Sequence, residues 1–189
     1  MKVLTGKEKL IVQGKVTDVA LQEFWAWNFS DLLNNTMRGA YAEFLVSKAL
    51  GLDMSETRVD WGAYDITYRS LRIEVKSSAY LQAWEQTKPS KIQFSIAPSR
   101  AWSPASGYEN LSVRHSDVYV FCLFTARIKE TANLLNTDEW VFYVMPTKEI
   151  DEIFKEKKTV SLNALLKINP QICTFQDLQH VIDRLIGEN

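Results

Sequence analysis

Alternating and continuous apolar runs predict several strands in the middle of the chain. Residues 91–96 alternate between polar and apolar side chains, as a half-buried strand does. Residues 117–124 and 140–145 are almost continuously apolar, which is typical of strands covered on both faces. A shorter strand is expected at residues 9–12. The central part of the chain is therefore expected to supply a sheet.

Segments with apolar residues at helical spacing precede and follow these strands in the sequence. Residues 36–50 are predicted to form a long helix that ends at Gly51, where a left-handed cap is expected. Before it, an aromatic-rich helix is expected to begin at Thr17 or Asp18. After the strands, three helices are predicted at residues 148–154, 162–167 and about 175–186.

This order of elements predicts an α/β fold. No internal repeat or linker interrupts it, so residues 1–189 are interpreted as a single domain. Most of the strands are expected to be antiparallel. The predicted architecture is a central mixed β-sheet of about five strands that is flanked by helices.

A hairpin in residues 63–79 carries the most unusual charge pattern in the chain. A two-residue turn at Arg69-Ser70 would pair Tyr68 with Leu71, and three steps back it would place Asp65 opposite Glu74. Directly opposed carboxylates repel each other and destabilise a sheet. A divalent cation would turn this repulsion into ligation, because hard cations bind carboxylate oxygens.

Lys76 and Glu43 extend this cluster. Side chains alternate along a strand, so Lys76 shares a face with Glu74. A metal ion and a lysine together supply what phosphodiester hydrolysis requires. Glu43 lies on a small-residue face of the helix at 36–50. The alternative interpretation is an edge-strand Glu/Lys pair with a coincidental Asp65 and a solvated Glu43.

Asp65 followed by Glu74-Val75-Lys76, with an acidic helix before them, resembles the PD-(D/E)xK nuclease superfamily, which has the restriction-endonuclease-like fold. Residues 38–46 resemble its first core helix. The resemblance covers a core of about residues 36–145 and leaves N-terminal and C-terminal helical extensions. Tyr64 stands in place of the name-giving proline. Gln86 stands where the exonuclease-type Gln-x-x-x-Tyr signature would have a tyrosine after Gln82, so that signature is absent.

The resemblance implies roles for individual residues. Asp65, Glu74 and the Val75 carbonyl would bind Mg²⁺, for which Mn²⁺ would substitute, and Lys76 would position the attacking water. Glu43 would bind a metal-bound water or a second ion. The residues expected to contact the substrate are Arg38, Arg72, Ser77, Ser78 and Gln82. Further DNA contacts are expected from Arg69, Lys88, Lys91 and Arg100. Trp61, Trp84 and Trp102 are expected either to cover the core or to stack on bases.

The function expected from these residues is Mg²⁺-dependent endonucleolytic hydrolysis of phosphodiester bonds in DNA, in restriction, phage defence or DNA repair. A homodimer is expected, since two active sites would cut two strands, and a further protein partner is open. Two alternatives remain at this point. One is a nuclease fold that binds nucleic acid or a partner without cutting, and the other is a nuclease directed at RNA.

Net charge, cysteines and apolar segments limit how the chain could bind nucleic acid and where it would be located. A net charge of −1 produces no global field for nucleic acid, so any binding must come from a local patch. Cys122 and Cys173 lie in apolar surroundings and are interpreted as free buried thiols. The first residues lack the apolar core of a signal peptide, and the longest apolar run, at 118–124, is too short to span a bilayer. These observations predict a soluble cytoplasmic protein.

Overall fold

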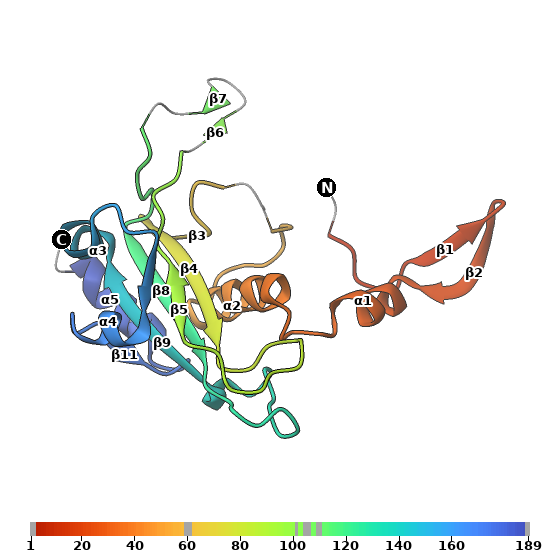
Figure 1. The fold of residues 1–189 in the computed structure, drawn as a ribbon. Coiled ribbons are helices and arrows are strands. Elements are labelled where there is room, and N and C mark those ends of the chain that lie inside the picture. Colours follow the sequence, from red (N-terminus) through yellow and green to blue (C-terminus); the bar gives the residue numbers. More distant parts are fainter. Residues whose placement is uncertain (1–2, 59–61, 101, 104–106, 109–110, 188–189) are drawn as a thin grey trace.

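A five-stranded mixed sheet lies at the centre of the body in a computed structural model that describes residues 3–58, 62–100, 102–103, 107–108 and 111–187 (Figure 1). Its strand order is β11-β9-β8-β4-β3, with only β4 and β8 parallel among these neighbours. The strands are β3 (Ile66–Tyr68), β4 (Leu71–Ala79), β8 (Val118–Phe124), β9 (Trp140–Pro146) and β11 (Gln171–Cys173). The predicted fold class is confirmed.

Different elements cover the two faces of this sheet. Helices α2 (Asn35–Ala49) and α5 (Leu178–Gly187) pack on one face, around side chains such as Val75 and Phe142. The other face packs around Phe121 and Met145. It is covered by α3 (Thr147–Phe154), α4 (Leu162–Leu166) and a small sheet of β5 (Gln93–Ser95) and β10 (Thr159–Ser161). The body therefore has three layers, and alternation along β8 sends Val120 to one core and Phe121 to the other.

The membership of the sheet differs from the prediction in one strand. Residues 91–96 were expected to belong to it, but β5 pairs with β10 in the small covering sheet. The fifth strand of the central sheet is β11, which the sequence does not reveal. β11 has three residues, of which only Cys173 is buried, so it is too short to show a periodic signal.

The cap predicted at Gly51 is confirmed, whereas Thr147 begins α3 as its first helical residue instead of capping it, and the first helix starts later than predicted. Gly51 has φ +66°, which is the left-handed conformation that favours glycine at a helix end. The hydroxyl of Ser161 accepts a hydrogen bond from the Ala164 N–H and caps α4. Helix α1 (Leu21–Phe29) begins at Leu21 instead of Thr17 or Asp18, because Lys15–Ala20 forms a strand, β2.

The N-terminal extension, predicted to be helical, contains a hairpin as well. Strand β1 (Lys9–Val12) pairs with β2 and leads into α1, and these elements project away from the body (Figure 1). We call residues 3–29 the arm. The remaining short elements are β6 (Trp102–Ser103), β7 (Gly107–Tyr108) and the 3₁₀ helix η1 (Thr137–Glu139).

Two smaller expectations can be compared with the described residues. Cys122 and Cys173 are both free and buried, as predicted. Within the described part of the chain, no helix has the length and apolar character that crossing a membrane requires.

Candidate active site

The β3–β4 hairpin has the predicted turn and register. Tyr68 pairs with Leu71, and Arg69 adopts φ +53° in the turn between them. Two contacts with α5 hold the turn in place. The Tyr68 hydroxyl donates to Asp183 Oδ1 at 2.9 Å, and Arg69 Nη1 lies 3.2 Å from the same oxygen. The hairpin is therefore anchored to a helix from the far end of the sequence.

Asp65 leaves the regular ladder through a β-bulge. Ile66 is the ladder partner of Ile73, yet the Asp65 N–H also bonds to the Ile73 carbonyl at 3.1 Å. Two consecutive residues thus oppose one, and this arrangement re-aims a side chain. The direct pairing of Asp65 with Glu74 that the turn predicts is therefore wrong. Instead, Asp65 Oδ2 accepts a hydrogen bond from the Val75 N–H at 2.7 Å.

This hydrogen bond also locates the backbone carbonyl of Val75. The N–H and C=O of one strand residue point to the same edge of the strand. Since the Val75 N–H is directed at the Asp65 carboxylate, the Val75 carbonyl faces the same edge of β4. The β3–β4 ladder stops at Ile73, so β3 does not cover this stretch of β4.

Glu74 is partly buried and lies in an unfavourable environment for a carboxylate. Its pKa is raised, chiefly by burial and further by the negative charges of Asp65 and Glu43. Lys76, which forms an ion pair with Glu74, opposes this shift. Tyr119 lies beside Glu74 in the parallel β4–β8 ladder, and burial followed by the Glu74 charge raises the pKa of its phenol. Glu74, Asp65 and Glu43 are therefore close enough to interact electrostatically.

Glu43 is held by an arginine that the sequence did not single out. Arg58 Nε donates to Glu43 Oε2 at 2.5 Å, and Arg58 Nη2 donates to Oε1 at 2.6 Å. The Glu43 side chain is only 13% exposed, so this bidentate pair is partly shielded from solvent. Arg58 lies in the loop between α2 and β3, and only the folded position of this loop relates it to Glu43.

The donor types suit a hard divalent cation, although each carboxylate is engaged by its own partner. Among the residues that the structure describes, no three His, Cys, Asp or Glu side chains form a group that could hold a metal ion without rearrangement. Glu43 faces Arg58, Asp65 faces the Val75 N–H and Glu74 faces Lys76. Carboxylate and carbonyl oxygens are the ligands that Mg²⁺ prefers, and a bound cation would offset both the burial of Glu74 and the repulsion from Asp65 and Glu43.

Several of the predicted substrate-binding residues are occupied within the fold. Arg38 is 5% exposed and donates to the Leu33 carbonyl at 3.0 Å and to Asn35 Oδ1 at 2.7 Å, so its burial removes it from the surface. Ser78 and Gln82 are also buried. Ser77 is partly exposed, directly after Lys76.

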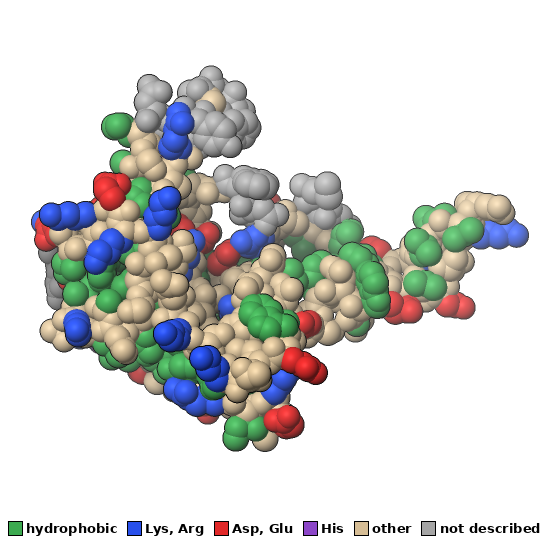
Figure 2. Space-filling view, viewed as in Figure 1, with side chains coloured by type: hydrophobic (Ala, Val, Ile, Leu, Met, Phe, Trp, Pro, Cys, Tyr) green, Lys and Arg blue, Asp and Glu red, His purple; other side chains and the backbone are tan. Residues whose placement is uncertain are grey.

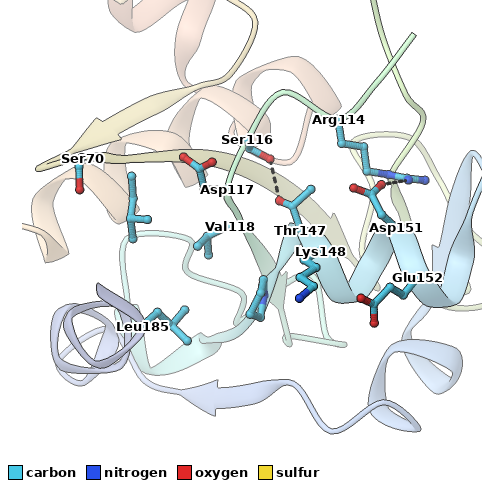
Figure 3. Close-up of a pocket in the computed structure, with 12 residues that line it drawn as sticks. Ser70, Arg114, Ser116, Asp117, Val118, Thr147, Lys148, Asp151, Glu152 and Leu185 are labelled. Carbon is cyan, nitrogen blue, oxygen red and sulfur yellow. Dashed lines mark hydrogen bonds and ion pairs between the residues drawn. The ribbon is translucent and has the colours of Figure 1, made fainter. Parts of the chain in front are cut away.

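Arg72 is paired with Asp117 at the beginning of β4. Its Nη2 lies 2.6 Å from Asp117 Oδ1, and this hydrogen bond lowers the pKa of the Asp117 carboxyl. Beside the pair lies a groove of about 770 Å³, where β4 and β8 start and β9 ends (Figure 3). Buried Arg114 in its wall donates to Asp151 and to the Ile96 carbonyl, which fastens α3 to the strand region around β5. Neither Glu74 nor Lys76 lines this groove.

The remaining residues predicted to contact DNA differ in their exposure and in their partners within the fold. Arg69 packs over the Tyr68 ring at 5.1 Å from its centroid and pairs with Asp183. Lys88, Lys91 and Arg100 are exposed. Trp84 is 57% exposed, which excludes the core for this residue. Trp61 lies outside the described residues, and the side chain of Trp102 does as well.

Gln86, at the position of the missing tyrosine, organises a loop. Its Oε1 accepts a hydrogen bond from the Gln82 N–H at 2.7 Å, and its Nε2 donates to Ser90 Oγ at 3.0 Å. These contacts close the segment that follows β4. Gln86 therefore has a structural role in the fold.

A basic and aromatic surface beyond the end of β4 was only partly predicted. Arg127 stacks on the Tyr80 ring at 3.7 Å from the ring centroid, and Lys129 Nζ donates to the Ala83 carbonyl at 3.1 Å. A groove of about 580 Å³ beside them is lined by Tyr80, Lys91 and Arg127, among others. We call this surface the β4-end lobe, and it comprises Tyr80, Trp84, Lys88, Lys91, Arg127 and Lys129. The parallel pairing of β4 with β8 brings Arg127 beside Tyr80, which no local sequence pattern could reveal.

Replacing Glu74 with glutamine is expected to stabilise the metal-free protein at pH 8. A raised pKa means that the native state binds more protons than the unfolded state, so stability falls as pH rises from the ordinary Glu pKa through the raised one. Glutamine carries no charge, so it removes the free-energy cost of ionising a partly buried carboxyl group. It can still accept a hydrogen bond from Lys76. We expect the Tm to rise by roughly 2–4 °C, as about 1 kcal/mol would give in a chain of this size.

The measurement is thermal unfolding in EDTA at pH 8 and at pH 4, with exposed Glu85→Gln as the matched control. The gain should shrink at pH 4, because Glu74 is protonated there in wild type. A Glu74→Gln variant less stable than wild type at pH 8 would contradict this account of the site.

Comparisons with known proteins add no family assignment. No protein-family model matches the chain, and no curated protein matches it. The functional conclusion therefore depends on the residues and on the geometry that the fold gives them.

Proposed function

We propose that this chain is a divalent-metal-dependent endodeoxyribonuclease of the PD-(D/E)xK superfamily. One observation supports this most strongly. Glu74 is partly buried near two further carboxylates, Asp65 and Glu43, and next to Lys76 at an edge of β4 that β3 leaves uncovered. A fold gains no stability from such an arrangement, whereas a partly buried carboxylate with a perturbed pKa beside further carboxylates is typical of functional sites.

Asp65, Glu74 and the Val75 carbonyl would hold Mg²⁺ or Mn²⁺. When bound, the ion supplies polarisation of a phosphoryl oxygen and an activated water. Lys76 lies beside these ligands, and its ammonium group would stabilise negative charge that develops on the phosphoryl group. The pair of Glu43 and Arg58 would border this site, with Glu43 as acceptor for a bound water and Arg58 as a donor to phosphate.

The β4-end lobe would carry the DNA backbone away from the site. Tyr80 directly follows β4, four residues after Lys76, which is about 13 Å in an extended chain. Exposed Arg127 stacks on its ring, exposed Lys91 lines the same groove and exposed Lys129 bonds to the Ala83 carbonyl, so all three offer charge to phosphates, while exposed Trp84 offers a ring for stacking. A local surface of this kind is what a chain of net charge −1 requires to bind nucleic acid.

The direct test is cleavage of supercoiled plasmid DNA with 5 mM Mg²⁺ or Mn²⁺ or with EDTA, on wild type, Lys76→Ala and Lys167→Ala. We expect nicked and linear DNA only with metal, and a rate about 10²–10³-fold lower in Lys76→Ala, because it removes a positive charge at the reacting phosphate. Lys167 is exposed directly after α4, and its replacement should leave the rate unchanged. Equal residual activity in wild type and Lys76→Ala would exclude Lys76 from catalysis.

A second candidate function is nucleic-acid binding without cleavage. The ion pair of Glu43 with Arg58 favours it, because this pair occupies a carboxylate that a metal-bound water would require. Calorimetric titration with Mn²⁺ separates the two functions. Metal binding that Asp65→Asn abolishes would support the nuclease, and DNA binding without any metal binding would support the binding protein.

A further inference from the structure

The arm exposes many large apolar side chains, because it is too small to bury them within itself. Trp27 is 82% exposed, the largest exposed fraction among the large hydrophobic residues that the structure describes as exposed. Helix α1 has no buried residue, and every residue of β1 is exposed. The exposed large apolar residues of its hairpin and helix are Leu10, Ile11, Val12, Val16, Val19, Phe24, Trp27 and Phe29. Figure 2 shows such side chains along the arm, away from the body.

The arm is nevertheless well organised internally. The ring of Trp25 packs so closely on Gly6 that a Cβ at residue 6 would lie 2.9 Å from it, and Gly6 adopts φ +86°. The backbone of Gly6 accepts a hydrogen bond from the Gln22 N–H at 2.9 Å, and the Glu23 carboxylate accepts one from the Ala20 N–H at 2.8 Å. A surface that is organised before binding loses less conformational entropy when it binds.

A two-stranded hairpin is marginally stable in water, and so is a nine-residue helix without a buried face. The arm must therefore gain stability from a surface that covers it. The charge of the arm excludes two classes of binding partner, nucleic acids and anionic membranes. Residues 3–29 contain three lysines, three carboxylates and no arginine, so they lack the basic face that DNA or an anionic membrane attracts.

We propose that the arm pairs with the same arm of a second copy of this chain. Balanced charge lets identical surfaces meet without net repulsion, as a two-fold symmetric interface requires. Aromatic side chains bury about 150–250 Å² each, and the three exposed aromatic residues with the five exposed aliphatic ones offer an apolar surface of the size that one partner contributes to a standard interface, roughly 800 Å². Phe24 and Trp27, with ring centroids 6.3 Å apart, form an aromatic anchor on α1.

A groove on the arm gives this pairing a place for an inserted side chain. It has a volume of about 500 Å³ and lies between the hairpin and α1, lined mainly by apolar residues that include Leu4, Leu10, Val19 and Phe24. Ile11 and Val16 are cross-strand partners, so they share one face of the hairpin. A second arm can therefore be accommodated both at the groove and against the hairpin. The pairing does not depend on the chemistry at Glu74.

The test is sedimentation equilibrium of the full chain from 1 to 100 μM. We expect wild type at about twice 21.7 kDa, and the double variant Val16→Glu/Trp27→Glu, which adds two like charges to each arm, at the mass of one chain, with a Kd raised at least 100-fold. Ile172→Lys is the matched control, because it places a charge at a 58% exposed site on the edge strand β11. Wild type at the mass of one chain throughout, or dissociation by Ile172→Lys alone, would overturn the proposal.

Gly6→Ala adds a variant that introduces no charge. Alanine at φ +86° is strained and collides with Trp25, so it should disorder the arm and raise the Kd of the dimer at least tenfold. The body should keep its thermal transition in all of these arm variants, since the arm contributes nothing to either core. A Kd unchanged by Gly6→Ala would contradict an interface that depends on the organised arm.

Discussion

Asp65→Asn is expected to lower the rate of metal-dependent DNA cleavage on the order of 10³-fold, equivalent to about 4 kcal/mol of lost stabilisation. The amide oxygen of asparagine can still accept the hydrogen bond from the Val75 N–H, so the bulge should persist. What the variant loses is a negative charge among the metal ligands. The loss should therefore appear in metal affinity and cleavage while the protein remains folded.

The measurement combines single-turnover cleavage of a labelled duplex with the Mn²⁺-induced rise in Tm, which reports binding to the native state. Asp138→Asn makes the same chemical change on the exposed helix η1 and should match wild type in both assays. An Asp65→Asn variant that cleaves at the wild-type rate would remove Asp65 from the site. A variant that fails to bind metal and also loses its thermal transition would indicate a structural role instead.

Trp140→Ala is expected to lower the free energy of unfolding by about 3–5 kcal/mol. Trp140 is fully buried at the start of β9, packs against Phe124 and Tyr41, and donates its indole N–H to the Leu134 carbonyl at 2.9 Å. Alanine would leave a cavity between the sheet and α2 and an unpaired carbonyl. Because Tyr41 lies two residues before Glu43 on α2, relaxation into this cavity would also reach the candidate site.

Urea unfolding followed by circular dichroism measures this loss. Trp84→Ala is the matched control, because Trp84 is 57% exposed in the β4-end lobe and its removal should change stability by about 0.5 kcal/mol or less. Similar destabilisation by both variants would show that the core around Trp140 is not packed as described.

The turn at Arg69-Ser70 shows how far the sequence could predict the site. Two polar residues between two alternating runs were enough to fix the register of Tyr68 with Leu71. The bulge at Asp65 could not be predicted, because it arises when two backbone groups share the Ile73 carbonyl, and no side-chain pattern records that. The composition of the site was predicted, whereas the orientation of its first carboxylate required the structure.

The contacts of Arg58, Arg127 and β11 could not be predicted, because each joins residues that are distant in sequence. Arg58 reaches Glu43 across a loop, and Arg127 reaches Tyr80 only because β4 and β8 are parallel neighbours. β11 joins the sheet by pairing with β9, a choice decided by tertiary packing and not by the three residues themselves. Local patterns therefore predicted the long helix α2 and the long strands β4, β8 and β9, whereas contacts between residues distant in sequence decided the short strands and the pairing of strands.

The link between Tyr68 and Asp183 has a consequence for how the protein is made. The two residues are 115 positions apart, and Gln179 also donates to the Tyr68 hydroxyl, at 3.1 Å. A ribosome adds about 5–20 residues per second, so the hairpin waits for several seconds, without its anchors, until α5 is synthesised. During that interval the nascent chain already carries Asp65, Glu74 and Lys76 but lacks the helix that holds their strands in place. The order of synthesis thus delays assembly of the site until the fold around it is nearly complete.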